Sequence, residues 1–393
     1  MRYPYSRPNI VAKDIEAVMA VLQGQFLTQG PVVERLESAL KNLFPVKHAV
    51  VCNSGTAALH MAYNGLELGP NAGLITSAVT FLATANAARM CNAPVGLADV
   101  DPVTGNVTFE TIKAAVEAAS FKVRAIAVVH LGGRPCEMIA ISAYAKSIGA
   151  YLVEDACHAP LAEYTDAAGA SFSVGSCAHS DAATLSFHAI KHVTAGEGGV
   201  LLTNSDALAK QARLFRSHGL ERDPSELKNQ DCAGAPWYYE MHELGYNYRL
   251  SEVSCALALN QVSRLAKNNQ RRQEIAALYH QHLSGMDFVK LPEITSPENG
   301  SHAWHLFAPR FDFDAIGKSR KEIMFALADQ GIGSQVHYIP LYHQPYYKDK
   351  ESDNTFAGAE KYYQQTLSLP MYFGLSDDDI YKISTTLRSV INR

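Results

Sequence analysis

The chain has 393 residues, of which 47% are hydrophobic and 19% are charged, and its formal net charge is −5. This length allows two or three domains, and the composition is that of an ordinary soluble globular protein. The charge excludes a strongly basic surface for nucleic acid, and no apolar run is long enough to span a membrane.

The first residues and the cysteines indicate the compartment. The opening segment, MRYPYSRPNI, lacks the apolar core of a signal peptide. Seven cysteines, an odd number without a C-x-x-C pair, favour a reducing environment and free thiols. We therefore expect a cytoplasmic protein that binds neither nucleic acid nor membranes.

The first part of the chain alternates short apolar runs with helical patterns. Helices are expected first at 14–22 and 31–44. Strands are then expected at 48–52, 74–79, 95–98, 123–131, 151–153, 182–187 and 200–203. Helices are expected between and after them at 57–66, 81–91, 111–119, 136–148 and 204–214. This βαβ alternation predicts a mostly parallel sheet covered by helices, with ligands outside the carboxyl ends of its strands.

The rest of the chain predicts a smaller second domain. A polar, turn-rich loop at 221–239 precedes a long helix expected from 253 to about 283. Beyond a proline-containing linker at 291–300, further elements are expected: strands at 304–311 and 333–338, and helices at 318–330, 357–366 and 377–391. We therefore divide the chain into a large α/β domain, residues 1–250, and a long connecting helix with a small α+β domain, residues 251–393.

A small polar turn follows the first expected strand. Its residues, Asn53-Ser54-Gly55-Thr56, lead directly into a helix. Backbone N–H groups and the helix dipole at such a turn can hold a phosphate, and Ser54 and Thr56 can add hydroxyl donors. An ordinary helix N-cap uses the same residue types, so the turn alone leaves both interpretations open.

Two further residues lie where strands are expected to end. Asp155 follows a buried strand, where a carboxylate needs a partner such as a protonated ring nitrogen. It could instead be a helix N-cap. Phe81 follows another strand end, and offers either a core side chain or a flat surface on which a planar ring can stack.

The segment 184–204 centres on Lys191. This lysine lies five residues after Ser186, between His188 and His192, and before the glycine-rich GEGG at 196–199. A desolvated lysine amine is a nucleophile, whereas a lone lysine is usually exposed on the surface. The two histidines are spaced for a metal pair, but no glutamate lies between them and no third ligand is evident, so no metal site is expected.

These features together fit one cofactor. The set comprises a phosphate cradle, a ring-stacking residue, a carboxylate at a strand end, a hydroxyl and a lysine. Pyridoxal phosphate (PLP) needs all of them, because its aldehyde needs an amine, its ring nitrogen an acidic partner, and its phosphate N–H and O–H donors.

The same residues carry a resemblance to a known family. The matching motifs are LTQG at 27–30, NSGTAAL at 53–59, TFLATANA at 80–87, VEDACHA at 153–159, SFHAIKHVTAGEGG at 186–199, FRSHG at 215–219 and GYNYRLSE at 245–252. The chain resembles the DegT/DnrJ/EryC1/StrS sugar aminotransferases, which are PLP enzymes of fold type I. The resemblance implies a seven-stranded, mostly parallel sheet flanked by helices, with a smaller C-terminal α+β domain.

The resemblance also implies roles at matching positions. Lys191 would form the Schiff base, Asp155 would pair with the ring nitrogen, His158 would lie near the ring hydroxyl, and Phe81 would cover the ring. The cofactor phosphate would be held by Ser54, Gly55, Thr56, Ser186 and, from a neighbouring subunit, Asn247. A homodimer with shared active sites follows from this last contact.

The sugar-nucleotide substrate is expected to meet a further set of side chains. They are His188, Glu197, Arg249, His337 and Tyr338. The last two belong to the aromatic loop 337–345, which could line a polar pocket or simply be a surface loop packed by its own rings.

Finer motifs resemble the enzymes that aminate C4 of nucleotide-linked 4-keto-6-deoxy sugars. SFHAIK, FRSHG and QVHYIPLY together most resemble the UDP-sugar aminotransferases of pseudaminic acid synthesis. This implies UDP-2-acetamido-2,6-dideoxy-β-L-arabino-hexos-4-ulose as substrate and L-glutamate as amino donor.

Other functions were weighed against this one. Other C4 aminotransferases, of the GDP-perosamine or dTDP/UDP-4-amino sugar type, stay open, because relatives often carry HLYG where this chain has HLGG at 130–133. Relatives that dehydrate at C3 have histidine in place of Lys191. A non-catalytic nucleotide-sugar binding or regulatory protein would not need the lysine, the carboxylate and the cradle together.

Overall fold

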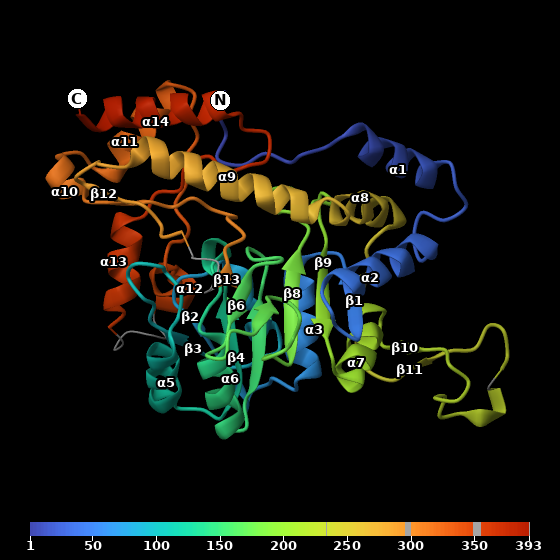
Figure 1. Ribbon diagram of the computed structural model, residues 1–393. Helices are drawn as coiled ribbons and strands as arrows, with labels where there is room; N and C mark the ends of the chain where they lie inside the picture. Colours follow the sequence, from blue (N-terminus) through green and yellow to red (C-terminus); the bar gives the residue numbers. More distant parts are fainter. Residues whose placement is uncertain (233, 295–299, 349–354, 393) are drawn as a thin grey trace.

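A seven-stranded sheet forms the centre of the computed structural model, which describes residues 1–232, 234–294, 300–348 and 355–392 (Figure 1). The strand order is β1-β9-β8-β5-β4-β2-β3. The bounds are β1 His48–Cys52, β2 Gly73–Ser77, β3 Val95–Ala98, β4 Val123–Val129, β5 Tyr151–Asp155, β8 Ala182–Ser186 and β9 Gly199–Thr203. Strand β9 runs antiparallel to both neighbours, and the other adjacent pairs are parallel, which confirms the mostly parallel α/β sheet.

Helices cover both faces of this sheet because side chains alternate along each strand. Ala125 and Ala127 pack into one apolar cluster with α3, α4 and α7, whereas Ile126 and Val128 pack into another with α2, α5, α6 and α8. The bounds are α2 Pro31–Leu43, α3 Gly55–Gly65, α4 Leu82–Met90, α5 Phe109–Ala118, α6 Met138–Ser147, α7 Asp206–Arg216 and α8 Glu252–Val262. The preceding helix, α1 Ala12–Leu22, packs on α8.

The C-terminal elements enclose a third apolar cluster. Tyr279, Phe307 and Ile383 are among its fully buried members, and Tyr3 of the N-terminal segment joins them. The helices here are α9 Leu265–Leu283, α10 Phe313–Ile316, α11 Arg320–Asp329, α12 Pro345–Lys348, α13 Ala357–Gln365 and α14 Asp377–Asn392. In Figure 1, α9 and α14 run across one end of the sheet layer. The division into domains at residue 250 stays a prediction.

The expected long helix from 253 to 283 is wrong, because it is two helices. α8 ends at Val262 and α9 begins at Leu265. Neither glycine nor proline marks the break. Arg264 leaves the helical conformation there and binds the buried Asp14 of α1 at 2.6 Å, a tertiary contact that sequence periodicity does not reveal.

The strands expected at 304–311 and 333–338 are also wrong. Only β14, Arg310–Phe311, forms in the first, paired with β12, Val289–Lys290. The second makes one isolated bridge, Gln335 with Ser368. Trp304 and Phe307 are buried in a core built mainly of helices and loops, so their β propensity reflects packing.

Two short sheets were not expected. One joins β6 Glu163–Thr165, β7 Ser171–Ser173 and β13 Gly300–Ser301. The other is the hairpin of β10 Leu220–Glu221 and β11 Glu240–Met241, which brackets most of the predicted loop at 221–239. Part of the expected linker at 291–300 lies outside the described residues. Among those residues, no helix is both long and apolar enough to cross a membrane.

A buried carboxylate on α8 holds the start of α2. Glu252 is 1% exposed, and its two oxygens accept hydrogen bonds from the backbone N–H groups of Val32 at 2.9 Å and Val33 at 3.1 Å. A negative charge is favourable at a helix N-terminus, where these N–H groups have no partner within the helix. This contact fixes α2 against α8 over the sheet.

We predict that Glu252→Leu lowers the free energy of unfolding by roughly 2–4 kcal/mol, because it removes two charge-assisted hydrogen bonds from buried amides. Urea denaturation followed by circular dichroism measures this. Glu34→Leu, in the same first helical turn but exposed, is the control, and is expected to cost less than about 1 kcal/mol. Equal losses in the two variants would contradict the role given to Glu252.

Candidate active site

The candidate site lies where strands β1, β5 and β8 end. Strand β9 runs between β1 and β8, and its first residue, Gly199, pairs with both Cys52 and Ser186. This register places the turn after β1 beside the end of β8. Asp155 is the last residue of β5, whose next neighbour in the sheet is β8. The topology therefore gathers residues that are far apart in the sequence.

The turn at Ser54 forms an open cradle at the start of α3. Ser54 is the helix N-cap, and its Oγ accepts a hydrogen bond from the Ala57 N–H at 3.0 Å. The N–H groups of Gly55 and Thr56 have no hydrogen-bond partner within the described part of the chain. The N-cap interpretation is confirmed. The phosphate cradle stays a prediction, which the cap allows because it leaves these two donors free for an anion.

The cradle is too narrow for a side chain at two positions. A Cβ atom on Gly199 would lie 2.5 Å from the Ser54 carbonyl oxygen and 2.7 Å from the Gly55 nitrogen. A Cβ atom on Gly55 would lie 3.0 Å from that of Ser186. Glycine at both positions lets the backbones approach and leaves the free amides accessible.

Asp155 is buried and held by a hydroxyl. Its Oδ2 accepts a hydrogen bond from Thr84 Oγ1 at 2.7 Å, and its Oδ1 accepts one from the Cys157 N–H at 3.2 Å. No helix begins at Asp155, so the N-cap alternative is wrong. Thr84 was not predicted, although Thr80, four residues earlier, bonds its hydroxyl at 2.9 Å. Two threonines one helical turn apart were the available signal.

Lys191 lies in a turn between β8 and β9. Its N–H donates to the His188 carbonyl at 2.9 Å, and its side chain is half-buried, which rules out a freely exposed lysine. Burial lowers the pKa of its amine, while the nearby acidic groups of Cys157 and Asp155 act in the opposite direction. A lowered pKa increases the neutral, nucleophilic form of the amine.

A loop from the C-terminal part reaches the site through Tyr338. Its hydroxyl lies 3.1 Å from Nε2 of the buried His158, and the two rings stack with centroids 5.9 Å apart. Phe81, which is 57% exposed, lies 5.9 Å from the Tyr338 ring. His337 is buried instead, with its Nδ1 2.8 Å from Ser368 Oγ.

The other predicted contacts are more exposed. His188 Nε2 lies 3.9 Å from Glu197 Oε1, and both side chains are substantially exposed to solvent. Arg249 is half-buried. The side chain of Asn247 is exposed, and its carbonyl accepts a hydrogen bond from Asn53 beside the cradle. Among the described residues, no group of three histidine, cysteine or acidic side chains is arranged to hold a metal ion.

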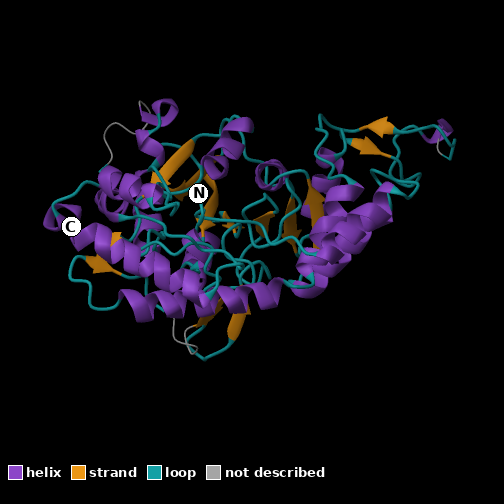
Figure 2. Ribbon diagram, turned by 90° about the horizontal axis from the view of Figure 1, so that it is seen from above, coloured by secondary structure: helices purple, strands orange, loops and turns teal. Residues whose placement is uncertain are grey.

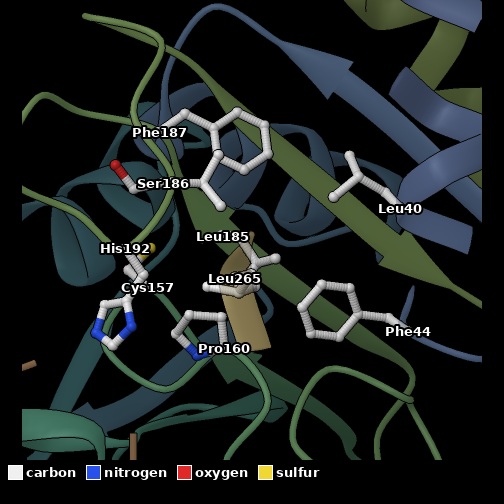
Figure 3. A pocket seen from close by; sticks show the side chains of 10 residues that line it. Leu40, Phe44, Cys157, Pro160, Leu185, Ser186, Phe187, His192 and Leu265 are labelled. Atoms are coloured by element: carbon white, nitrogen blue, oxygen red, sulfur yellow. The ribbon is translucent and has the colours of Figure 1, made fainter. Parts of the chain in front are cut away.

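A small cavity lies behind the cradle (Figure 3). Cys157, Ser186 and His192 line one side, and Leu40 and Phe44 lie on the other. Its volume of about 10 Å³ has room for about one water molecule, so it is not the pocket of a cofactor or sugar.

Buried histidines in and next to the site make folding sensitive to acid. Burial lowers the pKa of all of them: His158, His192, His302, His305 and His337. For His302 and His337 the pKa falls to about 3. These rings stay neutral in the folded protein at a pH where the unfolded chain, with an ordinary pKa of about 6.5, binds protons.

We therefore predict that the free energy of unfolding decreases as the pH falls from about 6.5 to about 4, by up to about 1.4 kcal/mol per pH unit for each ring. Urea denaturation at a series of pH values measures the slope. His302 accepts a hydrogen bond from the Trp304 N–H at 2.8 Å, which the amide oxygen of His302→Asn can replace without titrating. In that variant the slope of unfolding free energy against pH should be smaller by the contribution of one ring, up to about 1.4 kcal/mol per pH unit. An unchanged slope would contradict the prediction.

Comparison with known proteins places this arrangement in a family. Residues 8–388 match the DegT/DnrJ/EryC1/StrS aminotransferase family. The spore coat polysaccharide biosynthesis protein SpsC of Bacillus subtilis is 36% identical over 396 residues, covering 99% of this chain and 97% of that protein. The UDP-4-amino-4,6-dideoxy-N-acetyl-beta-L-altrosamine transaminase of Campylobacter jejuni is 35% identical over 389 residues, with the same coverage.

A solved structure agrees with the sequence comparison. Helicobacter pylori PseC, described as an aminotransferase involved in the biosynthesis of pseudoaminic acid, superposes with a TM-score of 0.89 at 28% identity over 100% of both chains. The family match spans nearly the whole sequence, and the fold agrees throughout. The chain therefore belongs to the DegT/DnrJ/EryC1/StrS aminotransferase family, and is a sugar aminotransferase of that family.

Proposed function

We propose that this protein uses PLP to transfer an amino group from L-glutamate to C4 of UDP-2-acetamido-2,6-dideoxy-β-L-arabino-hexos-4-ulose. The observation that carries the proposal is the convergence at one sheet edge of the free cradle amides, buried Asp155 and Lys191 with its lowered pKa. The names of the Campylobacter and Helicobacter relatives support the sugar. Seven free thiols support the cytoplasm as its location.

The residues present fit the cofactor. Gly55 and Thr56 offer two free backbone donors to a phosphate, and the Ser186 hydroxyl lies beside them. The Asp155 carboxylate, held by Thr84, provides an acceptor for a protonated ring nitrogen. When bound, PLP supplies an aldehyde that bonds to amines and a ring that takes up the electrons left when a proton is removed beside that amine.

Lys191 is the residue we assign to proton transfer. Its lowered pKa leaves more of the amine neutral, so it can accept a proton from the donor amino acid and return it at the neighbouring carbon. The same amine would hold the cofactor between turnovers. Asp155 would keep the ring nitrogen protonated throughout, because its carboxylate is fixed by two hydrogen bonds.

His158 and Tyr338 are assigned to orientation. The Gly132 N–H donates to His158 Nδ1 at 3.4 Å, and burial lowers the pKa of the ring, which leaves Nε2 as the protonated nitrogen. Nε2 then donates to the Tyr338 hydroxyl, whose own hydrogen is free for the cofactor or the sugar. Phe81 offers an exposed ring face above this pair.

One observation keeps other nucleotide-linked 4-keto sugars as alternative substrates. Gly132 has a φ of +68°, and among the described residues a Cβ atom there would meet only Leu306, at 3.8 Å. The room left by the missing side chain lies beside His158, so the pocket can differ from that of relatives with a tyrosine. GDP- and dTDP-linked sugars therefore belong in the substrate test.

We predict that the purified protein carries a visible cofactor absorbance band, that L-glutamate removes it, and that the UDP-linked ketosugar restores it. UDP-, GDP- and dTDP-linked 4-keto-6-deoxy sugars are added in parallel to identify the nucleotide. Lys191→Ala should lower turnover by at least about 10⁴-fold, because the covalent attachment and the proton carrier are lost together. Lys210→Ala changes an exposed lysine as a control, and should behave as wild type.

If only a GDP- or dTDP-linked sugar restored the absorbance band, the proposed UDP-linked substrate would be wrong, but the aminotransferase reaction would stand. A protein that stays colourless after incubation with PLP, or a Lys191→Ala variant with wild-type turnover, would overturn the proposed function. The spectrum therefore separates an aminotransferase from a non-catalytic sugar-nucleotide binding protein.

We also propose a homodimer with shared active sites. The hairpin of β10 and β11 extends away from the body of the protein as an arm, visible in Figures 1 and 2. Exposed apolar side chains gather on and beside it: Trp237, Tyr239, Met241, Leu244 and Tyr246. Such a concentration of exposed apolar surface is typical of a protein interface. Asn247, the residue proposed to reach the partner's phosphate site, directly follows this segment.

A mixing experiment tests the shared site. Lys191→Ala and Asn247→Ala proteins are each expected to be impaired. In a mixed dimer, one site combines the intact Lys191 of one subunit with the intact Asn247 of the partner subunit. We predict that unfolding and refolding the two variants together restores up to about half of the wild-type turnover per mixed dimer, because one of its two sites is complete.

Mass photometry gives the oligomeric state and differently tagged subunits isolate the mixed dimers. A monomer at assay concentration, or mixed dimers no more active than the parent variants, would contradict the shared site. Neither result would affect the assignment of Lys191.

A further inference from the structure

The residue after the proposed catalytic lysine is buried and makes one short hydrogen bond. His192 is 4% exposed, and its Nδ1 lies 2.7 Å from Oδ1 of Asn269 on α9. Its other ring nitrogen, Nε2, is buried without a partner in the described part of the chain. Figure 3 shows the ring at the border of the small cavity, beside Cys157 and Pro160.

The contacts of Asn269 decide which nitrogen of His192 carries the hydrogen. Asn269 Nδ2 donates to the Pro160 carbonyl at 2.7 Å. A carbonyl oxygen only accepts, so the amide group facing it must be the NH₂ and the group facing His192 must be the oxygen. Nδ1 of His192 is therefore the N–H donor, and Nε2 is an acceptor when the ring is neutral.

Burial lowers the pKa of His192 well below its usual value, and the nearby charge of Arg272 lowers it further. Arg272 is itself buried, and donates to the carbonyls of Trp304 and Met371. The His192 ring is thus neutral at physiological pH and adds no charge beside Lys191.

The hydrogen bonds from His192 to Asn269 and from Asn269 to Pro160 connect the two segments on which the proposed chemistry depends. His192 adjoins Lys191 covalently, whereas Pro160 lies in the turn that follows Asp155 at the end of β5. Asn269, 6% exposed on α9, bridges them with one donor and one acceptor of the same amide. Its amide is rigid, so the separation of the two segments is set by two short bonds.

We propose that His192 and Asn269 are positioning residues that hold the Lys191 turn at a fixed place relative to Asp155. This inference rests on the proposed function, in which Lys191 and Asp155 act on opposite ends of one cofactor. Neither side chain touches the reacting atoms, and their effect is exerted through the backbone of Lys191 and of the turn after β5.

Three variants test the proposal in the holoenzyme. His192→Leu and Asn269→Leu each remove the hydrogen bond between these two side chains. Both variants are expected to lower kcat by about ten-fold to 100-fold, as a small misplacement of a catalytic group does. KM for the ketosugar should change by less than about three-fold, because sugar contacts are untouched. His192→Asn places an N–H donor where Nδ1 lies, and should recover most of the lost kcat.

Asn268→Leu, at the adjacent buried position of α9, controls for general damage to the helix and should leave kcat unchanged. The pH midpoint of the cofactor absorbance band reports the surroundings of the Lys191 nitrogen without turnover. This midpoint should move in His192→Leu and Asn269→Leu, and should return toward the wild-type value in His192→Asn. Wild-type kcat and midpoint in His192→Leu would overturn the proposal, as would a His192→Asn variant as impaired as His192→Leu.

A measurement on the unaltered protein covers the case in which the leucine variants do not fold. Nitrogen NMR of protein labelled at histidine distinguishes protonated from unprotonated ring nitrogens, with His192→Asn used to assign the signal. We expect His192 to keep its hydrogen on Nδ1 and none on Nε2 between about pH 6 and about pH 9. A hydrogen on Nε2 would overturn the inference, whether or not the protein binds PLP.

Discussion

The site depends on the close approach of three backbone segments at Gly199. Strand β9 enters the sheet between β1 and β8, and its first residue pairs with the last residue of each. A side chain at this position would overlap the Ser54 carbonyl and the Gly55 nitrogen. Because nothing fills this position, the start of α3 lies against the end of β8. In the proposed function, the phosphate held there belongs to the same cofactor that Asp155 and Lys191 contact.

Burial of polar groups at this end of the sheet lowers the pKa of the Lys191 amine, and it also costs folding free energy. The same burial keeps the surrounding histidines neutral. Neutral rings can be packed together, as His158 and His305 are at 4.3 Å between ring centroids, without the repulsion of like charges. The apolar clusters on both faces of the sheet and in the C-terminal part provide the stability that offsets these buried polar groups.

Local sequence patterns predicted the parts of the fold that local physics determines. Strands β1 and β3 have the predicted bounds, because each is a short apolar run between two segments with a helical pattern. The prediction of C-terminal strands at 304–311 and 333–338 was wrong, because Trp304 and Phe307 pack in a core built mainly of helices and loops. The break between α8 and α9 was not predicted, because it depends on the contact of Arg264 with Asp14, 250 residues away.

The candidate site divides in the same way. Asp155, Lys191 and the cradle carry their signal in short segments, so the sequence alone could single them out. Thr84 bonds Asp155 across 71 residues, and Asn269 bonds His192 across 77. The spacing of Thr80 and Thr84 marks a threonine pair on a helix but not its acceptor, and nothing in the local sequence of Asn269 or His192 marks that pair. Only the packing of α4 and α9 against the strand ends brings these pairs together.

The site is therefore built from the whole chain rather than from the sheet alone. Tyr338 reaches His158 across 180 residues, and the Leu341 N–H donates to the Ala78 carbonyl at 2.9 Å, just after β2. Asn269 belongs to α9, which also packs in the C-terminal core. A cut at residue 250 would leave the cradle, Asp155 and Lys191 on one fragment, and would remove Tyr338 and Asn269, which hydrogen-bond His158 and His192. The geometry of the lysine and its carboxylate thus depends on how the C-terminal elements pack over the sheet.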